Sequence, residues 1–178
     1  MPFSIVRNDI TRMTTDAVVN AANSGLAPGG GVCGAIFTAA GYEKMEQACR
    51  AIGRCPVGQA VATRGFALPA QYVIHAVGPI WQGGDRGEAE LLASCYRSCL
   101  SLAAEHGIRT VDFSSISTGV YRYPLHQAAA VALRAIMDFL SAHDLPERVR
   151  MVCHTEETAA VYRQTWNLWY AGTKAERL

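Results

Sequence analysis

Short apolar runs alternate with longer amphipathic stretches along the whole chain. Branched and apolar residues dominate the short runs at 3–6, 17–20, 59–63, 72–77, 110–113 and 148–153. Runs of this length, apolar at nearly every position, are typical of strands buried on both faces. Between them, residues with apolar positions three or four apart predict helices from a glycine-rich loop to about 52, and at 88–106, 124–143 and 156–168. Strands that alternate with helices indicate an α/β fold, with a largely parallel or mixed sheet covered on both faces.

Residues that commonly end or begin helices stand at the ends of the predicted helices. Gly107 follows the second predicted helix, where a glycine commonly ends a helix. Pro124 opens the long alanine-rich helix, and proline fits the first turn. No internal repeat, linker or low-complexity segment divides the 178 residues, a length that suits a single domain. We therefore expect one domain over residues 1–170 and a loose C-terminal tail at 171–178.

Composition and charge narrow the possible partners. Half of the residues are hydrophobic and 17% are charged, which is ordinary for a folded domain. The formal net charge of +1 offers no basic field for a nucleic-acid backbone, so no nucleic-acid partner is expected. The apolar runs are far shorter than the roughly 18 residues of a membrane span, and the first residues do not form a signal peptide. We expect no membrane partner and a cytoplasmic location.

The cysteines predict neither disulfides nor a metal centre. Without a secretion signal, reduced thiols are the better interpretation of Cys33, Cys49, Cys55, Cys95, Cys99 and Cys153. No C-x-x-C pair or neighbouring pair of histidines supplies tetrahedral ligands. We therefore expect no metal and no cofactor.

Two loops rich in small residues follow predicted strand ends. The first covers residues 20–34 and contains three consecutive glycines, and the second covers residues 115–121. Glycine lets the backbone approach an oxyanion, and consecutive N–H groups form an anion-binding concavity. Each loop also leads into a helix, whose N-terminus favours a phosphate. A single such loop would suggest only a tight turn, but two of them at corresponding positions favour a site for a pyrophosphate.

The glycine spacing of two familiar phosphate-binding motifs is present, but the residues around the glycines do not fit either motif. Residues 29–34 satisfy G-x-G-x-x-G, but the dinucleotide fingerprint should follow its strand directly, and eight residues separate Asn20 from Gly29. No acidic residue stands at the end of the next strand. The glycine spacing of a P-loop is also present, but Gly31 and Val32 stand where lysine and serine or threonine are required.

Several motifs, in the same order, resemble the macrodomain family. They are residues 8–11 (NDIT), 19–23 (VNAAN), the glycine loop, 73–79 (VIHAVGP) and 116–124 (ISTGVYRYP). The likeness extends from residue 5 to about 154. It is greatest to the MacroD-type branch, which includes O-acetyl-ADP-ribose deacetylases. This resemblance implies a three-layer αβα fold around a mixed, mostly parallel central sheet, and the binding of ADP-ribose.

The resemblance also implies a role for individual residues. Asp9 matches the aspartate that accepts a hydrogen bond from the adenine amino group, and the lesser alternative is an aspartate that caps a turn. Asn23 matches the asparagine that holds the distal ribose, and His154 could lie beside the adenine. Asn20 resembles a structural loop residue, and His75, inside an apolar run, is expected in the core. The full implied set of ligand-binding residues is Asp9, Ile10, Ala22, Asn23, Gly30, Gly31, Val32, Cys33, Ser117, Thr118, Gly119, Val120 and Tyr121.

Departures from the family pattern concern catalysis more than binding. MacroD-type hydrolases commonly carry an aspartate at position 33 and often a histidine at position 37, where this chain has Cys33 and Phe37. Ser114-Ser115 stands in place of Pro-Ala where the second loop begins. A thiol near a helix N-terminus could act as a base or nucleophile, but no partner base is evident in the sequence.

Two functions remain open on these residues. One is hydrolysis of ADP-ribosyl esters, either mono-ADP-ribosylated protein carboxylates or O-acetyl-ADP-ribose, with Asn23 and Cys33 as the candidate catalytic residues. The other is a non-catalytic reader of free or protein-linked ADP-ribose, which the replacements at 33 and 37 favour. The intact binding motifs fit both. Of the two, we expect the hydrolase.

Overall fold

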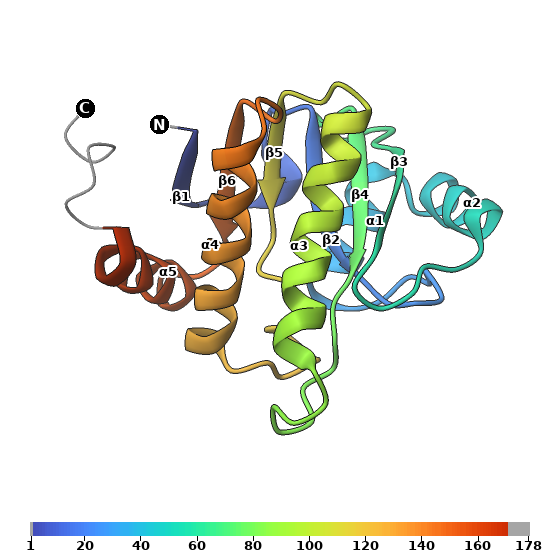
Figure 1. Ribbon diagram of the computed structural model, residues 1–178. Helices are drawn as coiled ribbons and strands as arrows, with labels where there is room; N and C mark the ends of the chain where they lie inside the picture. Colours follow the sequence, from blue (N-terminus) through green and yellow to red (C-terminus); the bar gives the residue numbers. More distant parts are fainter. Residues whose placement is uncertain (1, 171–178) are drawn as a thin grey trace.

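A twisted sheet forms the centre of the computed structural model, which describes residues 2–170 (Figure 1). Its strand order is β1-β6-β5-β2-β4-β3, and every neighbouring pair is parallel except β3 with β4. The prediction of a mixed, mostly parallel sheet is therefore confirmed. The strands are β1 (Phe3–Arg7), β2 (Ala17–Ala22), β3 (Ala60–Arg64), β4 (Tyr72–Val77), β5 (Thr110–Phe113) and β6 (Arg148–Cys153). The predicted tail at 171–178 lies outside the described residues.

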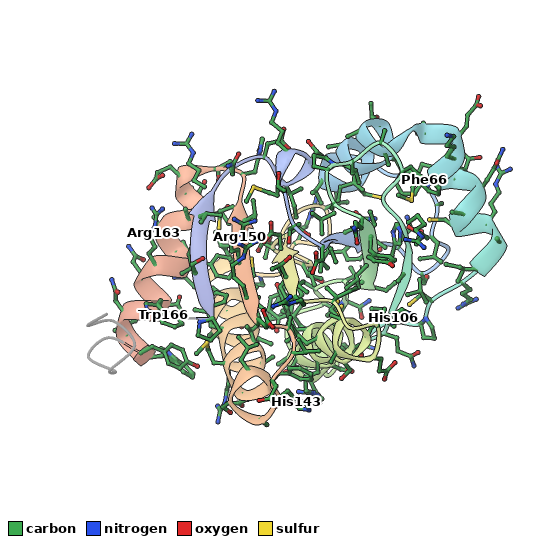
Figure 2. All side chains as sticks on the ribbon, turned by 90° about the horizontal axis from the view of Figure 1, so that it is seen from above. Phe66, His106, His143, Arg150, Arg163 and Trp166 are labelled. Carbon is green, nitrogen blue, oxygen red and sulfur yellow. The ribbon has the colours of Figure 1, made fainter. Side chains whose placement is uncertain are left out.

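Helices cover the sheet on both faces and confirm the three-layer αβα fold. In Figure 1, α3 and α4 lie in front of the sheet and α1 and α2 behind it. Figure 2 shows α5, with Arg163 and Trp166, alongside β1. The helices are η1 (Ile10–Arg12), α1 (Gly31–Ala40), α2 (Tyr42–Ile52), α3 (Glu88–Glu105), α4 (Leu125–Ala142) and α5 (Glu156–Tyr170). None of the helices within residues 2–170 is long and apolar enough to cross a membrane.

The core consists of two apolar layers, one on each face of the sheet. Along β2, Val18 packs in the layer under α1 and α2, and Val19 in the layer under α3, α4 and α5. Both side chains are fully buried. Because successive residues of a strand point to opposite faces, a central strand between two helical layers is apolar at consecutive positions. Each such valine stabilises the fold by about 1.5–3 kcal/mol.

The prediction of one helix from the glycine loop to about residue 52 is wrong. The chain breaks at Gly41, whose φ of +104° is a backbone conformation that favours glycine. Gly41 ends α1 and begins α2, and its N–H donates to the carbonyl of Thr38. Pro124 also differs from expectation, because it is the N-cap residue before α4 and not part of the first turn.

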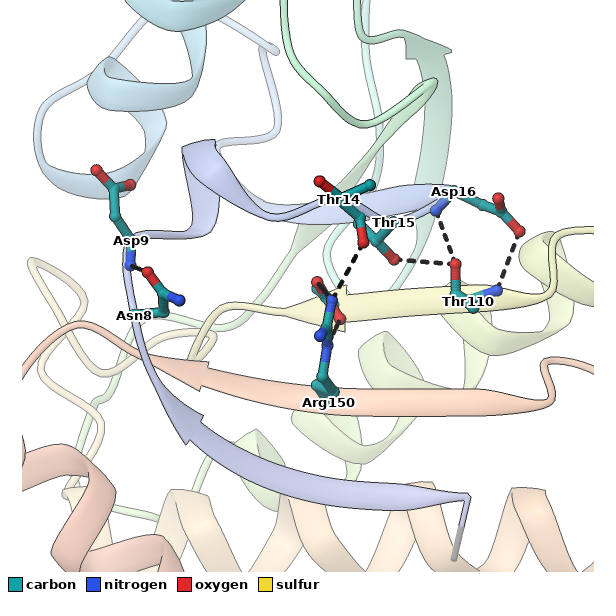
Figure 3. A network of polar contacts seen from close by, with 8 residues as sticks. Asn8, Asp9, Thr14, Thr15, Asp16, Thr110 and Arg150 are labelled. Atoms are coloured by element: carbon teal, nitrogen blue, oxygen red, sulfur yellow. Dashed lines mark hydrogen bonds and ion pairs between the residues drawn. The ribbon is translucent and has the colours of Figure 1, made fainter.

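A buried ion pair links neighbouring strands on the face that α1 and α2 cover only in part. Arg150 of β6 donates through Nε and Nη2 to the two carboxylate oxygens of Asp112 of β5, at 2.7 Å each. Asp112 is fully buried, and Arg150 also donates to the carbonyl of Thr14 at 3.4 Å (Figure 3). Beside this pair, Asp16 accepts from the backbone N–H of Thr110 at 3.2 Å. These contacts fasten the segment that leads from Asp9 into β2.

Candidate ligand-binding cleft

The two small-residue loops meet at the C-terminal edge of the parallel strands, around a cleft of about 720 Å³. Ligands of open α/β sheets bind at this edge, and the volume lies in the range of small-molecule sites. The cleft is lined by all of the predicted ligand-binding residues, and in addition by Asn8, Ala21, Gly29, Ala35, Gly78, Ser114, Ser115, Ile116, Val152, Cys153, His154 and Thr158. A hollow of about 670 Å³ beside Tyr42 and Phe66 contains none of the predicted residues, so the cleft is the better candidate.

The second loop presents unpaired backbone donors. Within the described residues, the N–H groups of residues 117–121 have no hydrogen-bond acceptor, while the N–H of Ile116 donates to the Tyr96 hydroxyl at 3.2 Å. Ser117 has a φ of +67°, which is uncommon for a residue other than glycine. The loop is closed by the N–H of Tyr123, which donates to the carbonyl of Ser117 at 2.9 Å. Consecutive free N–H groups in such a turn are suited to the oxygens of an anion.

The first loop presents the N-terminus of α1. The helix begins at Gly31, whose φ is +56°, and no acidic residue lies in its first turn. The first N–H groups of a helix have no partner within the helix, so those of residues 31–33 are available in the cleft. Gly34 must remain small, because a Cβ atom there would lie 2.6 Å from the carbonyl oxygen of Gly29. Backbone donors and the helix dipole both favour a negative charge at this position.

Gly78 is a site residue that the sequence analysis missed as such. It follows β4, and a Cβ atom there would lie 2.2 Å from Oγ of Ser117 and 2.5 Å from Cγ2 of Ile116. The available signal was its position directly after a predicted strand at the same sheet edge as the two loops. Ser117 Oγ is buried and has no hydrogen-bond partner within the described residues. Close packing of Gly78 against the second loop therefore shapes the floor of the cleft.

Asp9 both caps a helix and lines the cleft. Its Oδ1 accepts from Thr11, at 2.7 Å from the hydroxyl and 2.9 Å from the backbone N–H. These hydrogen bonds lower the pKa of Asp9; burial opposes them, and Arg12 and His154 lower it further. Its Oδ2 lies 3.8 Å from Nε of Arg12. Capping does not exclude the predicted role, because an ionised carboxylate keeps further lone pairs for an amine donor.

The side chain of Asn23 braces the first loop. Its Oδ1 accepts from the N–H of Ala27 at 3.0 Å, and its Nδ2 donates to the carbonyl of the same residue at 2.9 Å. The backbone carbonyl of Asn23 also accepts from Leu26 at 2.9 Å. One Nδ2 hydrogen and one Oδ1 lone pair are left over. Asn23 can therefore meet a sugar hydroxyl while it holds the loop.

Cys33 lines the cleft, and no base stands beside its thiol among the described residues. Its Sγ is 3.6 Å from Nδ2 of Asn20 and 4.0 Å from the carbonyl of Ala27. A thiol needs a neighbouring base or a lowered proton affinity to act as a nucleophile. Asn20 supplies only an amide. It is a fully buried residue of β2, so its expected place in the loop is wrong. The Asn20 amide thus connects β2 to the thiol of Cys33 and has a structural role.

His75 stands behind Asn20 and lies in the core, as the apolar run predicts. Its Nδ1 is 3.1 Å from Nδ2 of Asn20, and its Nε2 is 2.9 Å from Oγ1 of Thr63. Burial lowers the pKa of His75 to about 4, so the ring is neutral at physiological pH. Phe37 packs edge-on against the same ring at 6.3 Å. Position 37 is thus filled by a core aromatic residue that does not line the cleft.

This geometry defines a class of protein. A mixed sheet between helical layers, with unpaired backbone donors on both sides of a cleft at its C-terminal edge, is an α/β domain built to hold an anionic ligand. Within residues 2–170, no group of three or more His, Cys, Asp or Glu side chains could hold a metal ion. The donors of the cleft are instead backbone N–H groups and small polar side chains.

Comparisons with known proteins give the family. The family model described as "Macro domain" matches residues 19–132. A "Macro domain-containing protein in gbd 3'region" from Cupriavidus necator is 53% identical over 166 residues, which cover 91% of this chain and 95% of that protein. An "O-acetyl-ADP-ribose deacetylase" from Salmonella gallinarum is 51% identical over 164 residues, 90% of this chain and 91% of that protein. The chain belongs to the Macro domain family.

Solved structures agree with this assignment. The Oceanobacillus iheyensis macrodomain with ADP superimposes with a TM-score of 0.90 at 40% identity, covering 99% of this chain and 93% of that one. A variant of the same macrodomain with ADPR gives a TM-score of 0.89 at 42% identity, covering 93% and 92% of the two chains. The Trypanosoma brucei macrodomain in complex with ADP-ribose gives 0.85 at 37% identity, covering 92% and 68%.

Proposed function

We propose that this chain binds ADP-ribose and hydrolyses ADP-ribosyl esters. The observation that carries the proposal is the pair of unpaired N–H rows, at residues 31–33 and 117–121, that border one cleft. Together they suit the oxygens of a diphosphate, which no single loop would surround. The similar macrodomains with ADP or ADP-ribose, and the relatives named O-acetyl-ADP-ribose deacetylase, support the same ligand.

The strand order gives the ligand a direction along the cleft. Asp9 follows β1 and His154 follows β6, the two strands on one side of the sheet. Asn23 follows β2 and Gly78 follows β4, which lie toward the other side, so all four residues stand along the same C-terminal edge. We assign the adenine to the end with Asp9, because its ionised carboxylate accepts from an amine. The distal ribose and its ester then lie beside Asn23 and Cys33, and the diphosphate lies between them.

Hydrolysis at this end depends on positioning. Water adds to the ester carbon, the ester bond breaks, and ADP-ribose and a carboxylate are released. Because no base stands beside Cys33 in the part of the chain that the structure describes, we assign orientation of the water to the Asn23 amide and to the ligand's own phosphate oxygens. Positioning of this kind supplies a large part of catalysis. The lack of a base is also the observation that favours the second candidate function, a reader that binds without turnover.

We propose further that the protein-linked substrate is a carboxylate side chain modified with a single ADP-ribose, and that the protein acts in the cytoplasm. Residues 1–170 would form the whole ligand-binding domain. Limited proteolysis, with ADP-ribose binding measured on the product, tests whether residues 171–178 are dispensable.

The decisive experiment measures release of ADP-ribose from a protein modified on glutamate, and conversion of O-acetyl-ADP-ribose. Wild type is compared with Asn23→Ala and Cys33→Ala, and Cys95→Ala is a matched thiol control on α3, away from the cleft. We expect Asn23→Ala to lower turnover by about 10²-fold, because a misplaced water costs that much. We expect Cys33→Ala to change turnover by less than about 10-fold, well below the loss of a general base.

Calorimetry with free ADP-ribose on the same samples separates binding from chemistry. Binding without turnover in the wild type would make the protein a reader. Turnover lost in Cys33→Ala with binding retained would assign the missing catalytic role to the thiol. A wild type that does not bind ADP-ribose would refute the proposal as a whole.

A further inference from the structure

One carboxylate holds the loop between β4 and α3 together (residues 78–87, the β4–α3 loop). Glu88, the first residue of α3, is only 1% exposed. Its Oε2 accepts from the backbone N–H of Gln82 at 3.0 Å and from that of Gly84 at 2.8 Å, and its Oε1 accepts from the N–H of Arg86 at 2.6 Å. Hydrogen bonds from backbone N–H groups to an ionised carboxylate are among the stronger ones. Three of them on one side chain fix the path of the loop.

The β4–α3 loop contacts the second loop through Trp81. The backbone N–H of Trp81 donates to the carbonyl of Tyr121 at 2.9 Å, and the centre of its ring lies 4.7 Å from that of the Tyr123 ring. Gly84 packs on the other side of this link, because a Cβ atom there would lie 3.0 Å from Cη2 of Trp81. Trp81 therefore connects the loop that Glu88 fixes to the end of the second loop.

This link lies at the end of the cleft that the proposed function assigns to the distal ribose. The β4–α3 loop begins at Gly78, directly after β4, and β4 is the neighbour of β2, which leads to Asn23. Tyr121 lines the cleft, and its carbonyl is bound to Trp81 on this side of the sheet. Because ADP has no distal ribose, the link can affect the binding of ADP-ribose while the binding of ADP stays the same.

We propose that Glu88 is a positioning residue for the distal end of the cleft. By fixing the β4–α3 loop, it holds Trp81 against Tyr121 and so favours a ligand with a distal ribose over a nucleoside diphosphate alone. The inference rests on the proposed function and deepens it. Glu88 acts through Trp81 and does not line the cleft itself.

Glu88→Gln is the sharpest change, because it keeps the size of the side chain. Both carboxylate oxygens of Glu88 accept from backbone N–H groups. A glutamine has one oxygen and one NH₂ group, so an N–H of the loop would face another donor. Glu90→Gln is the matched control: Glu90 lies in the same first turn of α3, but its side chain is 77% exposed and pairs with Arg97.

The test measures the affinities for ADP-ribose and for ADP by calorimetry on wild type and both variants. We expect Glu88→Gln to bind ADP-ribose about 10-fold more weakly, the equivalent of one lost hydrogen bond, and to change ADP binding by less than about 2-fold. Glu90→Gln should bind both ligands as wild type does. The ratio of the two affinities is the critical readout, because a general loss of stability would not change it selectively.

A second pair of variants tests the link at Trp81 without changing a charge. Gly83 and Gly84 both have a φ of +95°, so alanine introduces the same backbone strain at either position. A Cβ atom at Gly83 meets nothing within 4 Å, whereas one at Gly84 would press on the Trp81 ring. Gly84→Ala should therefore lower the preference for ADP-ribose over ADP, and Gly83→Ala should keep it.

The outcomes separate this inference from the proposed function. Equal losses for ADP-ribose and ADP in Glu88→Gln and in Gly84→Ala would show a purely structural role and overturn the inference. Unchanged affinities in both variants would overturn it as well, and in either case the binding of ADP-ribose by wild type stands. If Glu88→Gln does not fold, the comparison of Gly84→Ala with Gly83→Ala decides. A wild type that binds neither ligand refutes the proposed function and the inference together.

Discussion

Single residues control the shape of the cleft at close range. A Cβ atom at Gly78 would overlap the second loop, and one at Gly34 would overlap the carbonyl of Gly29 within the first loop. Ser117 is held at a positive φ, and its hydroxyl has no hydrogen-bond partner among residues 2–170; local strain of this kind is common at binding sites. Asn23 uses most of its amide to hold the loop that it borders. The cleft is therefore formed before any ligand enters it.

At the residue scale we predict that Gly78→Ala destabilises the protein and weakens ADP-ribose binding. The new methyl group would meet Oγ of Ser117 at 2.2 Å and force the second loop to shift. Overpacking of this kind costs about 1–3 kcal/mol. Urea denaturation measures the loss of stability, and calorimetry the loss of affinity.

Gly119→Ala is the matched comparison for stability, because a Cβ atom there meets nothing within 4 Å. Its free energy of unfolding should stay within about 0.5 kcal/mol of the wild type. Equal stability of Gly78→Ala and wild type would show that the second loop gives way easily and that close packing does not shape the cleft.

At the scale of elements, strands are joined by more than backbone hydrogen bonds. Asp112 of β5 and Arg150 of β6 stand opposite each other in register, and two 2.7 Å hydrogen bonds connect them. The side chain of Arg150 is 20% exposed, while that of Asp112 is fully buried. Removal of one partner therefore leaves a buried charge without compensation, whereas replacement of both does not.

We predict that Arg150→Met lowers the free energy of unfolding by about 3–5 kcal/mol, because the carboxylate of Asp112 is then buried and unpaired. Asp112→Leu combined with Arg150→Met should recover much of that loss, since apolar replacements of both partners are often tolerated. Equilibrium denaturation of wild type, the single variant and the double variant completes the comparison. Arg148→Met, an exposed arginine of the same strand, is the control. A double variant as unstable as Arg150→Met would contradict this account.

For the whole molecule, the buried neutral His75 couples stability to pH. Its pKa is about 4 in the folded protein, against about 6.5 in the unfolded chain. Between these values the unfolded chain binds more protons, so acid favours unfolding. The stabilising effect of a neutral His75 is complete above pH 6.5 and is lost as the pH falls toward 4. The loss amounts to about 3 kcal/mol at pH 4.

Replacement of His75 by glutamine tests this coupling. We expect the stability of His75→Gln to be lower at pH 7 but to fall less steeply between pH 6.5 and pH 4. His106→Gln, which changes an exposed histidine, should retain the wild-type slope. Urea denaturation at several pH values provides the measurement. Parallel curves for wild type and His75→Gln would show that carboxylates alone cause the acid sensitivity.

The sequence by itself determined the order of the elements and the place of the site. Strands buried on both faces are apolar at every position, and loops at the ends of parallel strands meet at one edge, so both are visible from local patterns. All predicted ligand-binding residues accordingly line one cleft. The break between α1 and α2 at Gly41 could not be predicted, because the backbone φ of a single glycine within a helical pattern cannot be read from the sequence.

Tertiary structure alone decided which side chains meet across the chain. Asn20 lies between His75 and Cys33, and Phe37 fills the space beside His75. Ser115 is within hydrogen-bond distance of Tyr162, which is 47 positions away in the sequence. Such contacts depend on how helices and strands pack against one another. The pattern of apolar positions shows only which face of each helix or strand is buried. The chemistry of the cleft therefore depends on neighbours that no local pattern identifies.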